Sequence, residues 1–307
     1  EGSTWCGISL PNHWQLQGFD VPLYTNTVYP FQFDPPRARR NGLWPGENAT
    51  GLYRRKFSLS KEEFSQCKFF LVFAGVDSCL SVWVNGQYVG YSQDSCLPAE
   101  FDITDICRNK VNSTNLNTEH TLAVQVSRWC DGSYLEDQDK WWLSGIYREV
   151  YIEKRPVSFI ADFDPRTSRA PHAVRVEVWH RPTDRKPIAV YCKEISAGTD
   201  LPNRVAADSL HRSHRGVVDP TVAPDRPGVA TVKGTLTEPS VWTTETPFLY
   251  TLVVSLHTHL HDAQSGSKAL HARASKVGIR KVSIGGPDNM LRINDAPVTI
   301  AGINRHE

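Results

Sequence analysis

The sequence predicts a mostly β protein made of two sandwich domains. Short apolar runs of the kind that form strands recur along the whole chain, whereas amphipathic helical patterns are nearly absent. Nine Trp, ten Tyr and twelve Phe against a single Met are typical of aromatic-rich β structure. The length of 307 residues, at ~150 residues per domain, predicts about two domains.

Residues 1–155 are expected to form an antiparallel sandwich of the jelly-roll type. In residues 80–84 apolar side chains alternate with Ser81 and Trp83, and Asn85-Gly86 follows at once. An Asn-Gly pair favours a type I′ turn, because both central residues of that turn need a positive φ. The pattern therefore predicts a hairpin over residues 80–91. The strands expected in this domain are residues 69–73, 80–84 and 121–126.

Residues 156–284 are expected to form an immunoglobulin-like sandwich, because they hold a series of short strands separated by turn residues. Inside it, residues 197–228 are rich in Pro, Asp, Arg and Ser, which indicates a mobile surface insertion. Residues 291–294 and 298–300 then predict a new hairpin that opens a third domain over residues 285–307. The strands expected in the second domain are residues 158–163, 174–179, 188–192, 229–236, 249–256 and 277–284.

Composition and charge exclude several classes of protein. The 34 Lys and Arg against 33 Asp and Glu leave a formal charge of +1, whereas nucleic-acid and membrane-surface binders usually carry a basic excess. No apolar run approaches the ~20 residues of a membrane span. We therefore expect neither nucleic acid nor a membrane among the partners.

The seven cysteines are odd in number, scattered and without a CxxC pair. This pattern matches neither a disulfide framework nor a zinc site, so we expect mostly buried thiols in a reducing compartment, the cytoplasm. The chain begins at Glu1 with no apolar leader after it, so either a leader has been removed or the chain is a piece of a larger protein. Sequons at Asn48 and Asn112 would matter in a secreted protein, and secretion stays open.

The segment Asp131-Gly-Ser-Tyr-Leu-Glu-Asp-Gln-Asp139 packs four carboxylates into nine residues and is followed by Trp141-Trp142. One interpretation is a solvated acidic loop. The other is a site in which hard oxygen ligands bind a cation or sugar hydroxyls beside an aromatic wall. Spacing alone does not decide between them.

Strings of uncommon residues occur in a fixed order around this acidic segment. They are Trp14-Gln15, Gly18-Phe-Asp20, Tyr24-Thr-Asn26, Tyr29-Pro30, Glu47-Asn48, Thr50-Gly51, Gly90-Tyr-Ser-Gln-Asp-Ser95, Leu97-Pro98, Glu100-Phe-Asp102, Trp142, Ser144-Gly-Ile146, Arg148, Trp242, Glu245, Pro247, Leu249-Tyr250, Val277-Gly-Ile-Arg280 and Gly302-Ile-Asn-Arg-His-Glu307. Together they strongly resemble the bacterial and plant β-galactosidases of glycoside hydrolase family 2. The resemblance covers nearly the whole chain except the insertion at 197–228.

The resemblance implies a jelly-roll sugar-binding domain, an immunoglobulin-like sandwich and then a TIM barrel, so that residues 285–307 would start a (β/α)8 catalytic barrel. It implies that Asp139 helps to bind a sodium ion and the galactose 6-hydroxyl. It also implies that Asn48 contacts galactose and that His306 binds the substrate near its transition state. A glycan on the Asn48 sequon would block that galactose contact.

A retaining glycosidase needs two carboxyl groups about 5–5.5 Å apart. The family carries both as glutamates in the barrel beyond Glu307, and its magnesium ligands also lie outside this chain, so no catalytic residue is expected here. We therefore expect a full-length protein that hydrolyses terminal β-D-galactosides with retention, and an inactive 307-residue chain. The resemblance also implies that the full-length protein assembles as a homotetramer.

Two alternatives stay open. The chain could be a non-catalytic carbohydrate-binding or scaffold protein derived from this family, or part of another family 2 glycosidase, a β-glucuronidase or β-mannosidase. A module that stands alone has no reason to keep a strand without packing partners, because its apolar face promotes aggregation. The expected hairpin near the end of the chain therefore favours the enzyme.

Overall fold

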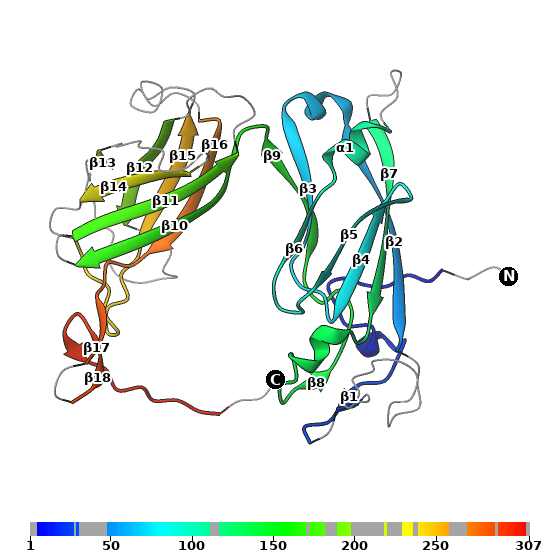
Figure 1. Ribbon diagram of the computed structural model, residues 1–307, viewed down its shortest axis with the longest axis horizontal. Coiled ribbons are helices and arrows are strands. Elements are labelled where there is room, and N and C mark those ends of the chain that lie inside the picture. Colours follow the sequence, from blue (N-terminus) through cyan, green and yellow to red (C-terminus); the bar gives the residue numbers. More distant parts are fainter. Residues whose placement is uncertain are drawn as a thin grey trace, which may run out of the picture. The chain divides into compact units, whose positions relative to one another are not determined.

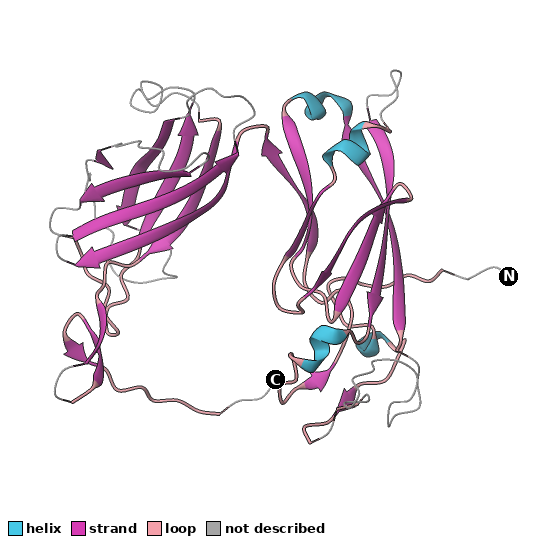
Figure 2. Ribbon diagram, viewed as in Figure 1, coloured by secondary structure: helices cyan, strands magenta, loops and turns pink. Residues whose placement is uncertain are grey.

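The computed structural model describes residues 5–27, 29–30, 48–110, 117–169, 172–181, 189–197, 218–219, 229–235, 239–257, 269–285 and 288–304. The chain divides into two compact units, residues 1–155 and residues 156–302. Strands dominate both units, and among the described residues helical turns occur only in the first (Figure 2). The predicted mostly β, sandwich-type fold is confirmed at this level.

The first unit contains two sheets and a short separate pair of strands (Figure 1). Its elements are η1 (Gln15–Gln17), β1 (Leu23–Tyr24), β2 (Thr50–Ser60), η2 (Lys61–Ser65), β3 (Cys67–Phe73), β4 (Cys79–Val84), β5 (Gln87–Gln93), β6 (Ala99–Asp102), α1 (Thr104–Arg108), β7 (Asn117–Ser127), η3 (Asp131–Tyr134), β8 (Trp141–Trp142) and β9 (Val150–Pro156). The larger sheet has the order β2-β7-β4-β5 and the smaller one the order β6-β3-β9. Strands β1 and β8 pair with each other.

Side chains from both sheets form one apolar core. On β4 the buried residues alternate with half-buried ones, as expected of a strand with one face on a core. On β3 all of residues 69–73 are buried, so both faces of that strand are covered. The core of this unit consists of Trp14, Leu59, Phe64, Phe69, Leu71, Phe73, Val76, Leu80, Val82, Val84, Ala99, Ile103, Cys107, Leu122, Val124, Val126 and Ile146.

The predicted hairpin at 80–91 is confirmed. Strands β4 and β5 pair antiparallel, and the turn between them has φ of 53° at Asn85 and 80° at Gly86. Both values lie in the left-handed region that a type I′ turn requires. This local match explains why a two-residue signal was enough to predict the hairpin.

The second unit also contains two larger sheets. Its elements are β10 (Phe159–Arg169), β11 (His172–Arg181), β12 (Ala189–Ala197), β13 (Val218–Asp219), β14 (Val229–Thr235), β15 (Tyr250–His257), β16 (His271–Val277), β17 (Val282–Gly285), β18 (Met290–Ile293) and β19 (Ala296–Pro297). The sheets have the orders β10-β11-β14-β13 and β12-β15-β16, with a third small sheet β17-β18-β19. The backbone N–H of Ile160 on β10 donates to Nδ1 of His271 on β16 (3.1 Å) and so ties the two larger sheets together.

The prediction of a single strand over residues 277–284 is wrong. Strand β16 ends at Val277, and β17 begins only at Val282 in a different sheet. Between them the carbonyl of Ile279 accepts the backbone N–H of Trp242 (2.9 Å), and a Cβ at Gly278 would lie 3.0 Å from the Trp242 side chain. The chain bends around a tryptophan that is distant in sequence, which the local apolar pattern could not reveal.

A hairpin is found where it was predicted over residues 291–300, but the predicted second strand at 298–300 is wrong, because the partner strand β19 lies at Ala296–Pro297. Strand β18 turns through Asn294 and Asp295, both with positive φ, and pairs with β19. Residues 298–304 contain no strand. Strand β18 also pairs antiparallel with β17. The barrel strand expected near the end of the chain stays a prediction.

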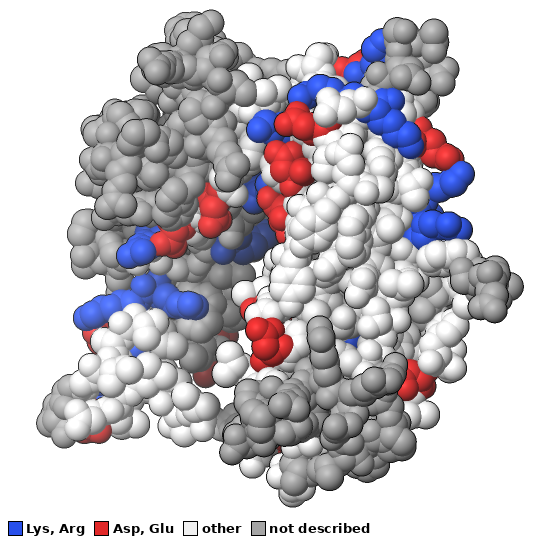
Figure 3. All heavy atoms as spheres, turned by 45° about the vertical axis from the view of Figure 1, so that its right-hand side comes forward, with Lys and Arg blue, Asp and Glu red and all other residues white. Residues whose placement is uncertain are grey.

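Other predictions fall outside the described residues. These are most of the insertion, residues 198–217 and 220–228, the sequon at Asn112, and His306. On the face drawn in Figure 3, acidic and basic side chains are interspersed. No helix in the described part of the chain is long and apolar enough to cross a membrane.

A core substitution tests the packing of the first unit. Phe73 is fully buried and its ring meets that of Phe101 edge-on at 6.2 Å. Phe73→Ala is expected to lower the free energy of unfolding of this unit by about 3–5 kcal/mol, because it removes apolar contacts and leaves a cavity. Chemical denaturation followed by Trp fluorescence measures the change. Leu52→Ala, at a site 64% exposed, is the control and is expected to stay within about 0.5 kcal/mol.

Candidate functional site

The acidic segment joins β7 to β8 and is flanked on each side by a buried tryptophan. Trp129 lies just before it and Trp142 just after it, and the two pack together with Leu23, Tyr29 and Tyr134. Tyr29 also donates its hydroxyl hydrogen bond to the carbonyl of Tyr134 (3.0 Å) within the segment. Both ends of the segment are therefore fixed by apolar burial.

The four carboxylates of the segment have separate roles. Asp131 accepts the backbone N–H of Gly132 (3.1 Å), a local turn contact. Glu136 accepts both the backbone N–H (2.8 Å) and the hydroxyl (2.7 Å) of Ser95. Asp137 is exposed. Glu136 is thus an anchor that joins the segment to the loop after β5, and the simple picture of a solvated acidic loop does not hold for it.

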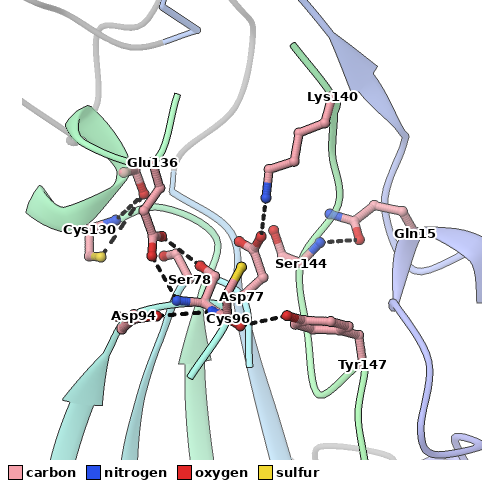
Figure 4. Close-up of polar contacts among 12 residues, drawn as sticks. Gln15, Asp77, Ser78, Asp94, Cys96, Cys130, Glu136, Lys140, Ser144 and Tyr147 are labelled. Atoms are coloured by element: carbon pink, nitrogen blue, oxygen red, sulfur yellow. Dashed lines mark hydrogen bonds and ion pairs between the residues drawn. The ribbon is translucent and has the colours of Figure 1, made fainter. Parts of the chain in front are cut away.

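The loop after β5 is held from a second side. The Tyr147 hydroxyl donates to the carbonyl of Ser95 (2.6 Å), and Arg148 donates to the carbonyl of Cys96 (2.7 Å). Figure 4 shows Tyr147 pointing at this loop from the opposite side to Glu136. These bonds keep the anchor of Glu136 in place.

Asp139 lies where the strand pair β1–β8 begins. The hydroxyl of Tyr24 donates to Oδ1 of Asp139 (2.5 Å), and Tyr24 is the register partner of Trp141. The rings of Tyr24 and Trp141 lie 5.6 Å apart. This hydrogen bond to the carboxylate raises the pKa of Tyr24, because the carboxylate favours the protonated phenol. Asp139 is half-buried, so its carboxylate is oriented while remaining accessible.

Asn48 is hydrogen-bonded to the backbone of Trp129, just before the acidic segment. Its Nδ2 donates to the carbonyl of Trp129 (2.7 Å), and its Oδ1 accepts the backbone N–H of Trp129 (2.9 Å). A carboxamide has a second N–H and a second lone pair, so Asn48 keeps capacity for a sugar hydroxyl. The structure therefore holds Asn48 at Trp129 and Asp139 at Tyr24, and it shows no contact between these two predicted residues. His306 lies outside the described residues.

Lys140, next to Asp139, is held by a half-buried carboxylate, that of Asp77. Its Nζ lies 3.4 Å from Oδ2 of Asp77 and points toward it in Figure 4. The backbone of Asp77 also exchanges two hydrogen bonds with that of Gly145. Burial raises the pKa of Asp77 to about 6, although the Lys140 ammonium opposes the shift.

Sequence reasoning missed three positioning residues: Tyr24, Glu136 as an anchor, and Asp77. The only local signal was Asp77 itself, a carboxylate close after the apolar run at 69–73. The partners of all three lie at least 41 residues away in sequence. Nothing in the local pattern identifies such partners.

A pocket of about 390 Å³ opens on the first unit near Asn48. Its lining includes Trp5, Trp14, Phe19 and residues 49–53, and it does not include Asp139. The carboxylate Asp20 in that lining is already bonded to Arg128 (2.7 Å). The carboxylate expected to bind sugar is therefore not part of this pocket.

Comparison with known proteins identifies the family. The family model of glycosyl hydrolases family 2, sugar binding domain, matches residues 3–156. The chain belongs to glycosyl hydrolase family 2. The resemblance stated from the residues is thereby confirmed.

Among this family, curated β-galactosidases match nearly the whole chain. The β-galactosidase of Vibrio vulnificus (strain YJ016) is 39% identical over 321 residues, which cover 99% of this chain and 27% of the relative. That of Vibrio cholerae serotype O1 is 37% identical over 313 residues, 100% of this chain and 28% of the relative. The chain thus spans just over a quarter of the length of these relatives.

Solved structures support the fold of this family 2 chain. A β-glycosidase from Bacteroides vulgatus gives a TM-score of 0.62 at 18% identity, over 96% of this chain and 32% of that chain. A Bifidobacterium dentium β-glucuronidase in complex with coumarin-3-O-glucuronide gives 0.58 at 19% identity, over 80% and 42% of the two chains. At these identities the likeness concerns the arrangement of strands alone.

The family resemblance implies a sodium ion at Asp139, and the described residues supply one suitable ligand for it. Hard cations bind oxygen ligands, and the Asp139 carboxylate is of that type. In the described part of the chain, no three His, Cys, Asp or Glu side chains converge in a way that could hold a metal. Asp139 therefore fits as one oxygen ligand of such an ion.

Titration of Tyr24 tests the geometry at Asp139. Asp139→Asn is expected to lower the pKa of Tyr24 toward its ordinary value, because a neutral carboxamide favours the protonated phenol less than a carboxylate does. Ring-carbon NMR of labelled tyrosine across alkaline pH measures this. Asp137→Asn, at an exposed position two residues away, should leave it unchanged. An unaltered Tyr24 pKa in Asp139→Asn would show that the hydrogen bond is not formed in solution.

The pH dependence of stability tests the environment of Asp77. Between about pH 4 and pH 6 the folded state keeps a proton on Asp77 that the unfolded chain has released. Stability from this group is therefore lost as pH rises through that window, by about 3 kcal/mol in total. Asp77→Asn lacks this dependence. Denaturant unfolding of both proteins from pH 4 to pH 7 should show the free energy of unfolding of the wild type falling relative to that of the variant. A difference between the two proteins that stays constant with pH would contradict the raised pKa.

Proposed function

We propose that this chain is the amino-terminal portion of a retaining β-galactosidase that hydrolyses terminal β-D-galactosides. The observation that carries the proposal is the 39% identity to the Vibrio vulnificus β-galactosidase across 99% of the chain. The first unit would be the family's jelly-roll sugar-binding domain and the second an immunoglobulin-like sandwich. Residues 285–307 would lead into the (β/α)8 barrel.

In this proposal the described residues bind and orient the sugar and do not carry out the chemistry. Asp139 would accept a hydrogen bond from the galactose 6-hydroxyl and supply one ligand to a sodium ion. Its half-buried position and its bond from Tyr24 support this role, since both restrict the carboxylate before sugar arrives. Asn48 would use its second N–H and lone pair on a sugar hydroxyl, and His306 would contact the substrate near the transition state.

The acid/base and nucleophile glutamates, and the magnesium ligands, would be supplied by the barrel. The 307-residue chain by itself is therefore expected to be inactive. The full-length enzyme would be a cytoplasmic homotetramer. The buried thiols Cys79, Cys107 and Cys130 support a reducing compartment.

A β-glucuronidase is the second candidate, because solved β-glucuronidases share the fold. Their identities to this chain, 17–19%, fall well below those of the β-galactosidases. A β-mannosidase and a non-catalytic sugar-binding protein complete the alternatives. The galactoside is favoured over all of them by the relatives in sequence.

Substrate preference tests the proposal directly. The natural full-length protein that carries this chain is expected to hydrolyse nitrophenyl β-D-galactoside in preference to the glucuronide and the mannoside. Release of nitrophenol under identical conditions measures all three. Activity confined to the glucuronide or the mannoside would overturn the galactoside assignment, and no activity on any of them would favour the binding protein.

Asp139→Asn tests the binding role within that enzyme. Loss of a charged hydrogen bond to the substrate is expected to lower kcat/KM for the galactoside by about 10- to 150-fold, which corresponds to about 1.5–3 kcal/mol. Asp137→Asn is the matched control and should retain wild-type kcat/KM. Equal kcat/KM values in the two variants would show that Asp139 does not bind the substrate.

A further inference from the structure

A pocket that the proposed function does not use lies on the first unit, between the N-terminal segment and the start of β2. Its volume is about 390 Å³, and its lining includes the aromatic side chains Trp5, Trp14, Phe19 and Tyr53. In Figure 1 the N-terminal segment, in dark blue, crosses the sheet near the start of β2. The volume falls at the lower end of the ~300–1,000 Å³ that is typical of small-molecule sites. The pocket therefore suits a small ligand.

Trp14 is a fixed wall of this pocket. Its side chain is buried, and its backbone N–H donates to the carbonyl of Ser144 (3.2 Å). A Cβ built on Gly51 would lie 2.8 Å from the Trp14 ring, so the ring packs directly on the backbone of β2. A side chain at that position would displace the ring. The wall is therefore formed before any ligand arrives.

Trp5 and Phe19 bring exposed aromatic surface to the pocket. Their side chains are 50% and 52% exposed. The Arg54 guanidinium lies 4.3 Å from the centroid of the Trp5 ring, and this cation–π contact restrains the ring. Aromatic rings at a binding site contribute a large contact area and stack on the apolar faces of a ligand. The two rings therefore offer a place for such a face.

Asp20 supplies an oriented acceptor among these rings. Its Oδ2 accepts a hydrogen bond from Arg128 (2.7 Å) and lies 3.5 Å from Nε1 of Trp14. Its Oδ1 accepts the backbone N–H of Val21 (2.8 Å). A carboxylate has about four acceptor positions, so these three donors leave a position for one more.

The charge of the Asp20 carboxylate is balanced within the protein. The Arg128 side chain that pairs with it is 8% exposed. Because the pair is neutral overall, it attracts neither a cation nor an anion strongly, but the carboxylate still accepts a hydrogen bond from a neutral hydroxyl. Thr50, also in the lining, donates its hydroxyl to the carbonyl of Asn48 (3.3 Å), so its oxygen can accept a second hydroxyl. The polar groups therefore match a neutral ligand with several hydroxyl groups.

We propose that this pocket binds a neutral pyranoside sugar, at a site separate from Asp139. The C–H groups on one face of the sugar ring pack on Trp5 and Phe19. Hydroxyl groups at the edge of the ring donate to Asp20 and Thr50. A sugar ring has an apolar face and a polar rim, and the lining presents the groups that complement both. Binding here makes and breaks no covalent bond and is independent of galactoside hydrolysis.

Protection of a thiol tests the proposal. Cys6 is exposed and lines the pocket, whereas Cys96 is exposed and outside the lining. The 307-residue chain is labelled with N-ethylmaleimide at increasing concentrations of lactose, a neutral disaccharide of pyranose rings, and mass spectrometry of the peptides gives the labelling rate at each cysteine. Lactose is expected to lower the rate at Cys6 along a saturable curve, because a sugar on Trp5 covers the neighbouring thiol. The rate at Cys96 should stay unchanged.

Variants at exposed positions locate the sugar. Trp5→Ala and Phe19→Ala are expected to raise the lactose concentration for half-maximal protection about tenfold, because each removes a stacking ring. Trp141→Ala is the matched control, since Trp141 is 51% exposed in the same unit and does not line the pocket. It should leave that concentration unchanged. Asp139→Asn should leave it unchanged too, so this site is tested separately from the sugar contact proposed for Asp139.

Three results would overturn the proposal. The first is a labelling rate at Cys6 that lactose lowers no more than the rate at Cys96. The second is a half-maximal concentration that changes in Asp139→Asn but not in Trp5→Ala or Phe19→Ala, which would locate the sugar at the acidic segment. The third is protection of Cys6 by benzyl alcohol without protection by lactose, which would show that the pocket takes an apolar ligand.

Discussion

The burial of Trp129 and Trp142 is the constraint on which the candidate site depends. These two residues bracket the acidic segment and pack in one apolar cluster, so a loop of polar residues has both ends fixed in the fold. Glu136 adds a third fixed point through its two bonds to Ser95. A charged loop held at three points presents its remaining carboxylates in defined directions, which a freely solvated loop would not do.

The carboxylates of the segment show why composition is a weak guide to a metal site. Four acidic residues in a row of nine suggest a cation site, yet Asp131 makes a local contact with the next residue and Glu136 serves as an anchor. Asp139 combines a hydrogen bond from Tyr24 with partial exposure. Its role depends on Tyr24, which comes from a strand 115 residues away.

Local features of the fold were predictable from the sequence and distant ones were not. The Asn85-Gly86 turn needs only two residues with positive φ, so the β4–β5 hairpin could be predicted from a short string. The break between β16 and β17 depends on Trp242, and no pattern within residues 277–284 contains that information. In the site, Asn48 and Asp139 were chosen by resemblance, whereas the bond of Asn48 to Trp129 emerges only when the chain is folded.

The central claim is that Asp139, held by Tyr24 in the segment between Trp129 and Trp142, faces bound galactose. A crystal structure of the natural full-length protein with galactose and sodium tests it most directly. The account predicts the galactose 6-hydroxyl within about 2.5–3.2 Å of the Asp139 carboxylate, with sodium bound to the same side chain and Asn48 still joined to Trp129. Galactose bound elsewhere, with Asp139 contacting neither sugar nor ion, would contradict it.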